Sequence, residues 1–279
     1  MTDGDLLLHF SAARHRVVKW THYFAIFEQL LSPYRGRAIT LVEVGVGDGG
    51  SLEGWRSYLG PSARIIGIDL NPAAKRLESD GFEIIIGDQS DPEFWAQHLP
   101  RLGPIDVLID DGGHTSVQQI VSVACALPHM RDGGVIVVED THTAYMPNQY
   151  PASRQFGFMQ FAQHVVDVMH LRNPLVTERA PDSAGLGRVI HSVQFFESLV
   201  VFHVDRRRCG PSEGFDAGSE ALPPSDPAAI PLRSRASGVL DAQPGWIRWL
   251  LQPVRRVIGS MWNASTRMAG ANRVRRFFR

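Results

Sequence analysis

Carboxylates gather at two places in the chain where an apolar run ends. Asp110 and Asp111 follow one run, and Glu139 and Asp140 follow a later one. If the two runs are neighbouring parallel strands, about 4.8 Å apart, then Asp111, Glu139 and Asp140 converge. Clustered carboxylates repel one another unless a cation lies among them, and hard oxygen ligands suit Mg²⁺. The pattern predicts a magnesium site, with helix capping by these acids as the alternative.

A histidine lies next to the first pair of carboxylates. His114 stands three residues beyond Asp111, on a predicted loop. An imidazole titrates near neutral pH and can take a proton from a metal-polarised hydroxyl group. We therefore expect His114 and Asp111 to be catalytic. His142 and Tyr145 follow the second pair and are candidate substrate contacts.

A glycine-rich stretch, LVEVGVGDGG, surrounds the end of an earlier apolar run. It places Gly45, Gly47, Gly49 and Gly50 where a tight turn can bring backbone N–H groups close to a ligand. The glycines at 45, 47 and 50 satisfy G-x-G-x-x-G. This motif alone fits a dinucleotide and S-adenosylmethionine equally well.

Further candidate cofactor contacts lie near the ends of the same runs. Asp69 ends the second run, 24 residues past the first glycine, where a carboxylate can accept hydrogen bonds from a ribose diol. Glu43 is a carboxylate inside an apolar run, so we expect it to face the ligand cleft or a backbone donor. The complete set of predicted cofactor contacts outside the glycines is Glu43, Ser51, Asp69, Asp88, Gln89 and Asp110.

Strand-like and helix-like stretches alternate strictly between residues 39 and 140. The predicted strands are 39–46, 63–70, 82–88, 105–111 and 133–140, and the predicted helices between them are 51–59, 71–79, 91–99 and 115–127. This alternation predicts an α/β fold with a Rossmann-like, doubly wound, mostly parallel sheet. Two further runs, 187–196 and 198–206, predict an antiparallel pair at the edge of the sheet.

Composition changes along the chain predict four parts. We expect an N-terminal helical segment (1–36), the α/β domain (37–209), a flexible linker rich in Gly, Pro and Ser (210–245) and a basic amphipathic helical tail (246–279). An amphipathic helix over 155–171 would serve either the core of the domain or a subunit contact.

The tail is strongly basic. From residue 242 onward there are eight arginines and no Asp or Glu, so the rest of the chain is acidic. No basic stripe runs through the predicted domain, which argues against nucleic acid as a partner. The tail fits either a peripheral membrane contact or packing on protein. No apolar run is long enough to span a membrane, and two cysteines do not make a disulfide framework, so we expect a cytoplasmic location.

Together these stretches resemble the class I S-adenosylmethionine-dependent methyltransferases. They resemble more closely the Mg²⁺-dependent sugar O-methyltransferases of macrolide and polysaccharide biosynthesis, which are related to the cephalosporin-hydroxylase-like family. The resemblance covers roughly residues 15–205 and is carried by VEVGVGDGGSL, GDQSD, DDGGH and EDTHTAY. The segment KWTHY (19–23) is a looser match to a family segment near the methionine end of the cofactor.

The resemblance implies methyl transfer from S-adenosylmethionine to a sugar hydroxyl, with Asp111, Glu139 and Asp140 as Mg²⁺ ligands and His114 as general base. It implies that the glycine loop and Ser51 hold the methionine part of the cofactor, that Asp69 holds the ribose and that Asp88 or Gln89 holds the adenine. It also implies a sugar-containing acceptor and a homo-oligomer, most simply a homodimer. Two other functions stay open: a nicotinamide-dependent oxidoreductase, and a membrane-associated sugar- or lipid-binding protein without catalysis.

Overall fold

The computed structural model describes residues 5–146, 149–150, 156–176, 182 and 185–213. The predicted tail, and the predicted linker after residue 213, lie outside the described residues. Within the described part no helix is long and apolar enough to cross a membrane.

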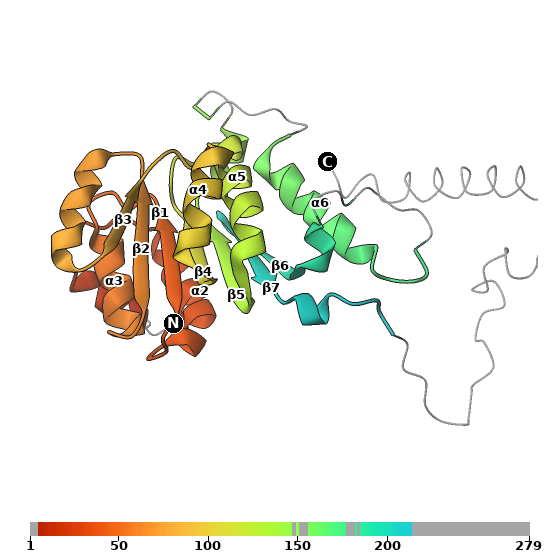
Figure 1. Ribbon diagram of the computed structural model, residues 1–279, viewed down its shortest axis with the longest axis horizontal. Coiled ribbons are helices and arrows are strands. Elements are labelled where there is room, and N and C mark those ends of the chain that lie inside the picture. The colour runs from red at the N-terminus through yellow and green to blue at the C-terminus, as the bar shows by residue number, and fades with distance from the viewer. Residues whose placement is uncertain (1–4, 147–148, 151–155, 177–181, 183–184, 214–279) are drawn as a thin grey trace, which may run out of the picture. The chain divides into compact units, whose positions relative to one another are not determined.

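A seven-stranded sheet forms the centre of the described part (Figure 1). Its strands lie in the order β3-β2-β1-β4-β5-β7-β6, and β1 to β5 are parallel to one another. β7 is antiparallel to both β5 and β6, which confirms the predicted antiparallel pair at the edge. The strands are β1 (Thr40–Val44), β2 (Arg64–Asp69), β3 (Glu83–Ile86), β4 (Ile105–Asp110), β5 (Met130–Val138), β6 (Ile190–Phe196) and β7 (Leu199–Val204).

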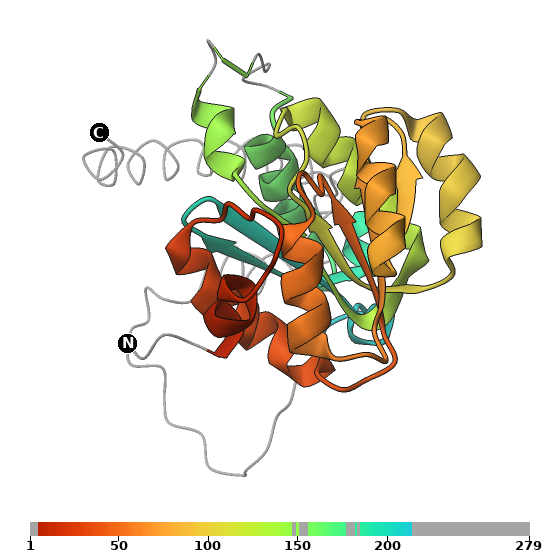
Figure 2. The same cartoon turned by 90° about the vertical axis from the view of Figure 1, so that its left-hand side faces the viewer.

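Helices cover both faces of the sheet, as Figures 1 and 2 show. The helices are α1 (Asp5–Ser11), α2 (Thr21–Leu31), α3 (Gly50–Leu59), α4 (Pro92–Leu102), α5 (Ser116–Ala126) and α6 (Phe158–His170). The first three share a buried cluster with one face of the sheet, and the last three share a cluster with the other. Successive residues of β1 divide accordingly, with Leu41 in the first cluster and Val42 in the second, because side chains alternate across a strand. The predicted Rossmann-like fold is confirmed.

Two elements differ from the expectation. The stretch predicted as a helix over 71–79 is a 3₁₀-helix, Pro72–Asp80. It buries only Ala74 and Leu77, three residues apart, and a 3₁₀-helix places such residues on one side. β5 begins three residues earlier than predicted and ends at Val138, so the two acids that follow it leave the strand.

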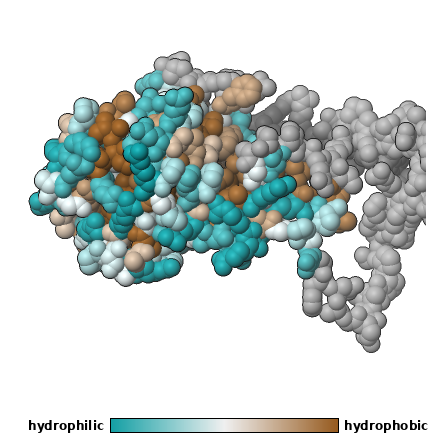
Figure 3. Space-filling model, in the orientation of Figure 1, coloured by the Kyte–Doolittle hydropathy of each residue, from teal (hydrophilic) through white to brown (hydrophobic). Residues whose placement is uncertain are grey.

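The amphipathic helix predicted over 155–171 is α6. Its buried residues, Phe158, Ala162, Val165 and Val168, belong to the cluster beneath α4 and α5. The apolar face of α6 therefore serves the core of the domain. The face of the described part seen in Figure 3 mixes hydrophilic residues with hydrophobic patches, the broadest of them toward the left of the view.

The strand order places a ligand site between β1 and β4. β2 and β3 lie on one side of β1, whereas β4 and β5 lie on the other, so the chain direction across the sheet reverses there. In open α/β sheets ligands bind at this point, beyond the carboxyl ends of the strands. The residues singled out from the sequence follow these strand ends.

Candidate active site

A pocket of about 430 Å³ opens at the carboxyl ends of β1, β2 and β4. Six of the predicted cofactor contacts line it: Gly45, Gly47, Ser51, Asp69, Asp88 and Gln89. The pocket walls also include residues that the sequence did not single out, chiefly Arg16, Val17, Val18, Leu70 and Gln118. Its position matches the ligand site expected from the strand order.

Gly45 lets the loop after β1 pack against the loop after β4. Its φ is +82°, and a Cβ atom on it would lie 2.1 Å from the backbone oxygen of Asp111. Any side chain would therefore push the two loops apart and strain the backbone. The glycine is required by this close approach at the pocket wall.

Asp69 holds the glycine loop in place. Its Oδ2 accepts hydrogen bonds from the N–H groups of Val46 and Gly47, at 3.0 and 3.2 Å. Its Oδ1 accepts one from the N–H of Asn71 at 2.8 Å. The carboxylate is thus fixed at the pocket wall.

Gln89 and Asp110 join two neighbouring strand ends. The Gln89 amide donates to Asp110 Oδ1 at 2.9 Å and accepts from the N–H of Gly113 at 2.9 Å. Asp110 is 1% exposed and lies behind the pocket wall. Burial raises the pKa of Asp110, although the hydrogen bond from Gln89 opposes this. The structure thus places Asp110 as a support for Gln89.

Three other predicted cofactor contacts also lie behind the pocket wall. Glu43 is fully buried and accepts hydrogen bonds from the Ser51 hydroxyl at 2.7 Å and the Trp55 indole at 3.1 Å. We expected Glu43 to face the ligand cleft or a backbone donor, but its hydrogen-bond donors are side chains. Gly49 precedes α3, and Gly50 begins it. A Cβ on Gly50 would lie 2.5 Å from the backbone oxygen of His15, so this glycine lets the N-terminal chain cross the helix.

We call this crossing segment, residues 14–20, the strap. Glu53 of α3 anchors its start by accepting hydrogen bonds from the N–H groups of Arg14 and His15, at 2.6 and 3.0 Å. Its middle residues line the pocket. It ends at Trp20, the residue before α2. The strap therefore connects the pocket with the carboxylates at the ends of β4 and β5.

Lys19 carries the strongest link between the strap and the sheet. Its side chain is 1% exposed, and its ammonium donates to Glu139 Oε1 at 2.6 Å and to Asp111 Oδ2 at 2.9 Å. Glu43 Oε1 lies 3.7 Å away. Burial alone would lower the pKa of Lys19, but the three carboxylates raise it well above its ordinary value. Burial also raises the pKa values of Glu43 and Glu139. The single ammonium, which is shared among three acids, does not offset this effect.

The sequence contains a signal for Lys19 that was missed. Only two of the 28 basic residues are lysines, Lys19 and Lys75. A lysine ammonium is a compact point charge, whereas a guanidinium is a wide planar fork. A buried space between three carboxylates fits the compact group, which explains a lysine in a chain that otherwise uses arginine.

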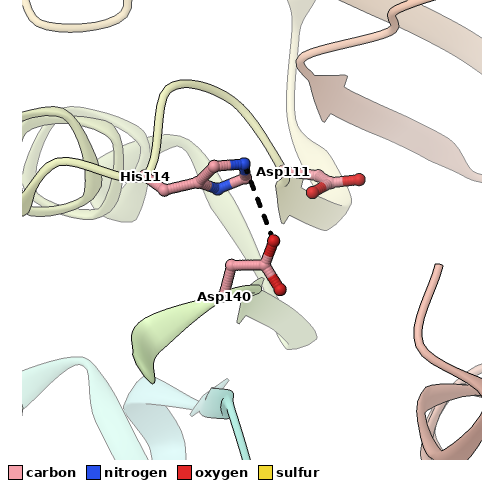
Figure 4. A group of neighbouring side chains, drawn as sticks. All are labelled: Asp111, His114 and Asp140. Carbon is pink, nitrogen blue, oxygen red and sulfur yellow. Dashed lines mark ion pairs between the residues drawn. The ribbon is translucent and has the colours of Figure 1, made fainter. Parts of the chain in front are cut away.

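Side-chain atoms that could ligate a metal ion come together beyond the carboxyl ends of β4 and β5. One ligand atom each from Asp111, His114 and Asp140 lies within 4.8 Å of the other two, and the three side chains come from two loops (Figure 4). His114 Nε2 lies 3.7 Å from Asp140 Oδ2. The ladder of hydrogen bonds continues past the strand ends, since the N–H of Glu139 donates to Asp110 O. The predicted convergence of the two strand ends is therefore present.

The structure brings two of the three predicted metal ligands into this group, together with His114. Glu139 is turned toward Lys19 and is outside the group. The two carboxylates supply the hard oxygen ligands that a divalent cation prefers, and the imidazole lies beside them. The buried Nδ1 of His114 has no hydrogen-bond partner among the described residues, so the ring has capacity for one more contact. These residues fit a metal ion.

Backbone strain marks the same two loops. His114 and Asp140 have φ values of 57° and 53°, which lie in a backbone region that residues other than glycine rarely adopt. The Thr143 hydroxyl lies 2.7 Å from His114 O and 2.9 Å from Asp140 O, and so ties the loops together. Such strain persists only where the surrounding structure holds it. Both side chains are thereby aimed at one point.

Asp140 is held from the side of the strap and α2. Its Oδ1 accepts hydrogen bonds from Tyr23 OH at 2.8 Å and from the Trp20 indole at 3.1 Å. Burial and the Asp140 carboxylate raise the pKa of Tyr23, so its hydroxyl stays a donor. The two candidate substrate contacts lie close by, in the 3₁₀-helix Thr141–Tyr145. His142 Nδ1 is 4.0 Å from Asp140 Oδ1, and Tyr145 is largely exposed.

Residues 42–141 match a protein family model described as a methyltransferase domain. Among curated proteins, the chain is similar to the 8-demethyl-8-alpha-L-rhamnosyl tetracenomycin-C 2'-O-methyltransferase of Streptomyces olivaceus. The two are 37% identical over 145 residues, and the match covers 49% of this chain and 38% of the relative. It is 36% identical over 197 residues to the mycinamicin VI 2''-O-methyltransferase of Micromonospora griseorubida, covering 63% of this chain and 48% of the relative. The chain thus spans less than half the length of either protein.

A solved structure is also similar. It is a methyltransferase of the mycinamycin biosynthetic pathway in complex with Mg and S-adenosylhomocysteine, with a TM-score of 0.63 and 25% identity, covering 84% of this chain and 58% of that one. A second crystal of the same enzyme also contains mycinamycin VI, with a TM-score of 0.61 and 24% identity, covering 76% of this chain and 56% of that one. The resemblance predicted from the sequence is confirmed by these matches.

The first prediction concerns the buried ammonium. Lys19→Met leaves Glu43, Asp111 and Glu139 without their cation, so it should destabilise the fold by about 3–5 kcal/mol. The folded state holds the pKa values of Glu43 and Glu139 above the unfolded value near 4.3, and therefore binds protons that the unfolded state releases as the pH rises. Loss of the ammonium raises these two pKa values further, so the loss of stability should be larger near pH 8 than near pH 5.5, as urea unfolding at both pH values will measure.

Lys75→Met is the matched control. Lys75 is half exposed and pairs with Glu78 on the surface, so its loss should cost less than about 1 kcal/mol at either pH. Equal losses for the two variants, or a larger Lys19→Met effect in acid, would contradict the assignment of Lys19 as the counter-ion of buried carboxylates.

Proposed function

We propose that this protein, in which residues 42–141 match a methyltransferase domain, transfers a methyl group from S-adenosylmethionine to a hydroxyl group of a sugar with the aid of a divalent metal ion. The observation that carries the proposal is the position of Asp111. It lines the cofactor-sized pocket and also belongs to the carboxylate–histidine group. A methyl donor in the pocket and an acceptor at the group would be immediate neighbours.

The comparisons support this choice over the alternatives. The family model and the relatives named above are methyltransferases, and the name of the tetracenomycin-C enzyme includes a rhamnosyl group. This favours S-adenosylmethionine over a nicotinamide dinucleotide as the ligand of the glycine loop. The strained, converging loops favour catalysis over binding alone, because strain of this kind collects at active sites.

We assign the cofactor roles by position in the pocket. The glycine loop and Ser51 would hold the methionine part, Asp69 the ribose, and Asp88 or Gln89 the adenine. Glu43, Gly49, Gly50 and Asp110 would act from behind the wall. Gln89 would contact the adenine through its side-chain amide, which Asp110 orients.

Asp111 and Asp140 would hold the metal, and Glu139 would lie beside them in its ion pair with Lys19. When bound, a divalent cation supplies Lewis acidity that lowers the pKa of an acceptor hydroxyl. His114 would accept the proton of that hydroxyl at an imidazole nitrogen. Asp140 would orient the ring, since its Oδ2 lies 3.7 Å from His114 Nε2. His142 and Tyr145 would contact the acceptor.

We propose further that residues 246–279 make a peripheral membrane contact at the cytoplasmic face, beside a lipid-linked acceptor. The support is the charge of the sequence, eight arginines without an acid, and Trp residues near an apolar stripe. The alternative is that the same stripe packs on protein. The homo-oligomer stays a prediction from the resemblance.

The second prediction tests the metal. A chelator should abolish methyl transfer and added Mg²⁺ should restore it. Asp140→Ala should remove both activity and Mn²⁺ binding measured by electron paramagnetic resonance without an acceptor, while S-adenosylhomocysteine affinity stays within a few-fold. Asp167→Ala, on the exposed side of α6, is the control and should change none of these. Full turnover in excess chelator would exclude the metal.

The third prediction tests the base. His114→Ala should lower kcat by about 10²–10⁴-fold, the range typical of a general base, with cofactor affinity nearly unchanged. His142→Ala should be mild by comparison, because His142 lies outside the group formed by Asp111, His114 and Asp140. Steady-state kinetics on both variants decide the matter: a severe His142→Ala beside a mild His114→Ala would move the role of base to His142.

The fourth prediction tests the tail. The full chain should co-sediment with anionic liposomes at low salt, and a version ending at Pro244 should not, because each arginine near an anionic surface contributes about 1 kcal/mol. Neutral liposomes serve as the control. If both proteins stay in the supernatant, the tail is an element that packs on protein.

A further inference from the structure

Trp20 is a large aromatic side chain that the fold leaves open to solvent. It is 55% exposed, whereas Trp55 and Trp95, the other tryptophans of the described part, are fully buried. An exposed indole gains little from the hydrophobic effect, so its position calls for another reason. It lies at the end of the strap, beside the candidate active site.

Polar contacts fix the orientation of this indole. Its Nε1–H donates to Asp140 Oδ1 at 3.1 Å, and its ring meets the His142 ring edge to face, with centroids 6.2 Å apart. The indole is therefore held in one place although it packs on little. A rigid aromatic surface with one fixed polar edge is suited to ligand binding, because little conformational entropy is lost when a ligand contacts it.

The strap sets the distance between Trp20 and the reacting groups. Val18 lines the pocket, Lys19 points inward to the buried carboxylates, and Trp20 reaches Asp140. Three consecutive residues thus touch the pocket, the sheet and the metal-ligating group in turn. An acceptor hydroxyl presented to His114 would have the rest of its ring beside the indole, since Asp140 contacts both side chains.

From this arrangement we propose that Trp20 is the platform on which the acceptor sugar stacks, and that the acceptor is a neutral pyranose with an apolar C–H face. The inference rests on the proposed function and adds the substrate class. The indole face carries negative charge density that attracts the C–H bonds of a pyranose ring. The hydroxyl groups at the ring edge then point toward Asp140 and His114. Uronic acids fit less well, because the four carboxylates Glu43, Asp111, Glu139 and Asp140 exceed the charge of Lys19 and a divalent cation by one negative charge.

Saturation-transfer difference NMR with methyl α-L-rhamnopyranoside tests the platform directly, on the full chain with Mg²⁺ and S-adenosylhomocysteine. Saturation should be strongest at the ring C–H protons of one face of the sugar. Trp20→Ala should weaken sugar affinity about tenfold, which corresponds to about 1.4 kcal/mol. Trp20→Phe keeps a ring but loses the hydrogen bond to Asp140, and should retain part of the affinity. A glucuronic acid methyl glycoside should bind more weakly than the rhamnoside.

Phe195→Ala is the matched control, because Phe195 is another exposed aromatic residue, on β6 at a different pocket. It should bind the rhamnoside like the unmodified protein. In turnover, Trp20→Ala should raise the acceptor KM and leave S-adenosylhomocysteine and Mn²⁺ affinity within about twofold. A fall in kcat at constant KM would overturn the platform and make the indole a positioning group for Asp140.

Absence of rhamnoside binding by the unmodified protein, or equal binding by Trp20→Ala, would also overturn the inference. These outcomes are separate from a failure of the proposed function. That failure would appear as no binding of S-adenosylhomocysteine, or as no methyl transfer to any glycoside, whatever the state of Trp20.

Discussion

One buried ammonium holds the candidate site together. Lys19 joins the strap to acids that follow β4 and β5 and to Glu43 inside β1, partners up to 120 residues away along the chain. Removing a charge from water is costly, and only close opposite charges compensate that cost. The lysine side chain can enter the protein only if the strap lies across the ends of these strands. The path of residues 14–20 follows from this requirement, as does the glycine at position 50 that makes room for it.

The fold could be predicted in most of its parts, and for an identifiable reason. Apolar runs bounded by glycines and acids have the length of strands that are buried on both faces. Their alternation with helix-like stretches predicted the parallel sheet, and two adjacent runs near its end predicted the antiparallel edge. The error at residues 71–79 arose because a short polar stretch with two buried residues looks alike as an α-helix or a 3₁₀-helix. The extent of β5 was missed because Arg131 and Asp132, exposed at its start, break the apolar pattern.

The site was predictable only where it lies on strand ends. Convergence of Asp111 and Asp140 follows from strand adjacency, which pattern alone suggests. The turning of Glu139 toward Lys19 depends on the strap, and no local signal reports a contact across 120 residues. Likewise, Glu43 looked like a ligand contact because a lone carboxylate in a strand needs a partner. The partners proved to be Ser51, Trp55 and Lys19, which come from two other segments.

Two sets of side chains share the site. Lys19 pairs with the buried Glu43 and Glu139, whereas His114 and Asp140 form a second group with Asp111. Asp111 takes part in both sets, because one of its oxygens faces Lys19 and its loop lines the pocket. Displacement of Asp111 would therefore shift the pocket wall and the carboxylate–histidine group together. The proposed methyl transfer requires donor and acceptor atoms in line at close range, and a shared residue of this kind would keep the two binding sites in register.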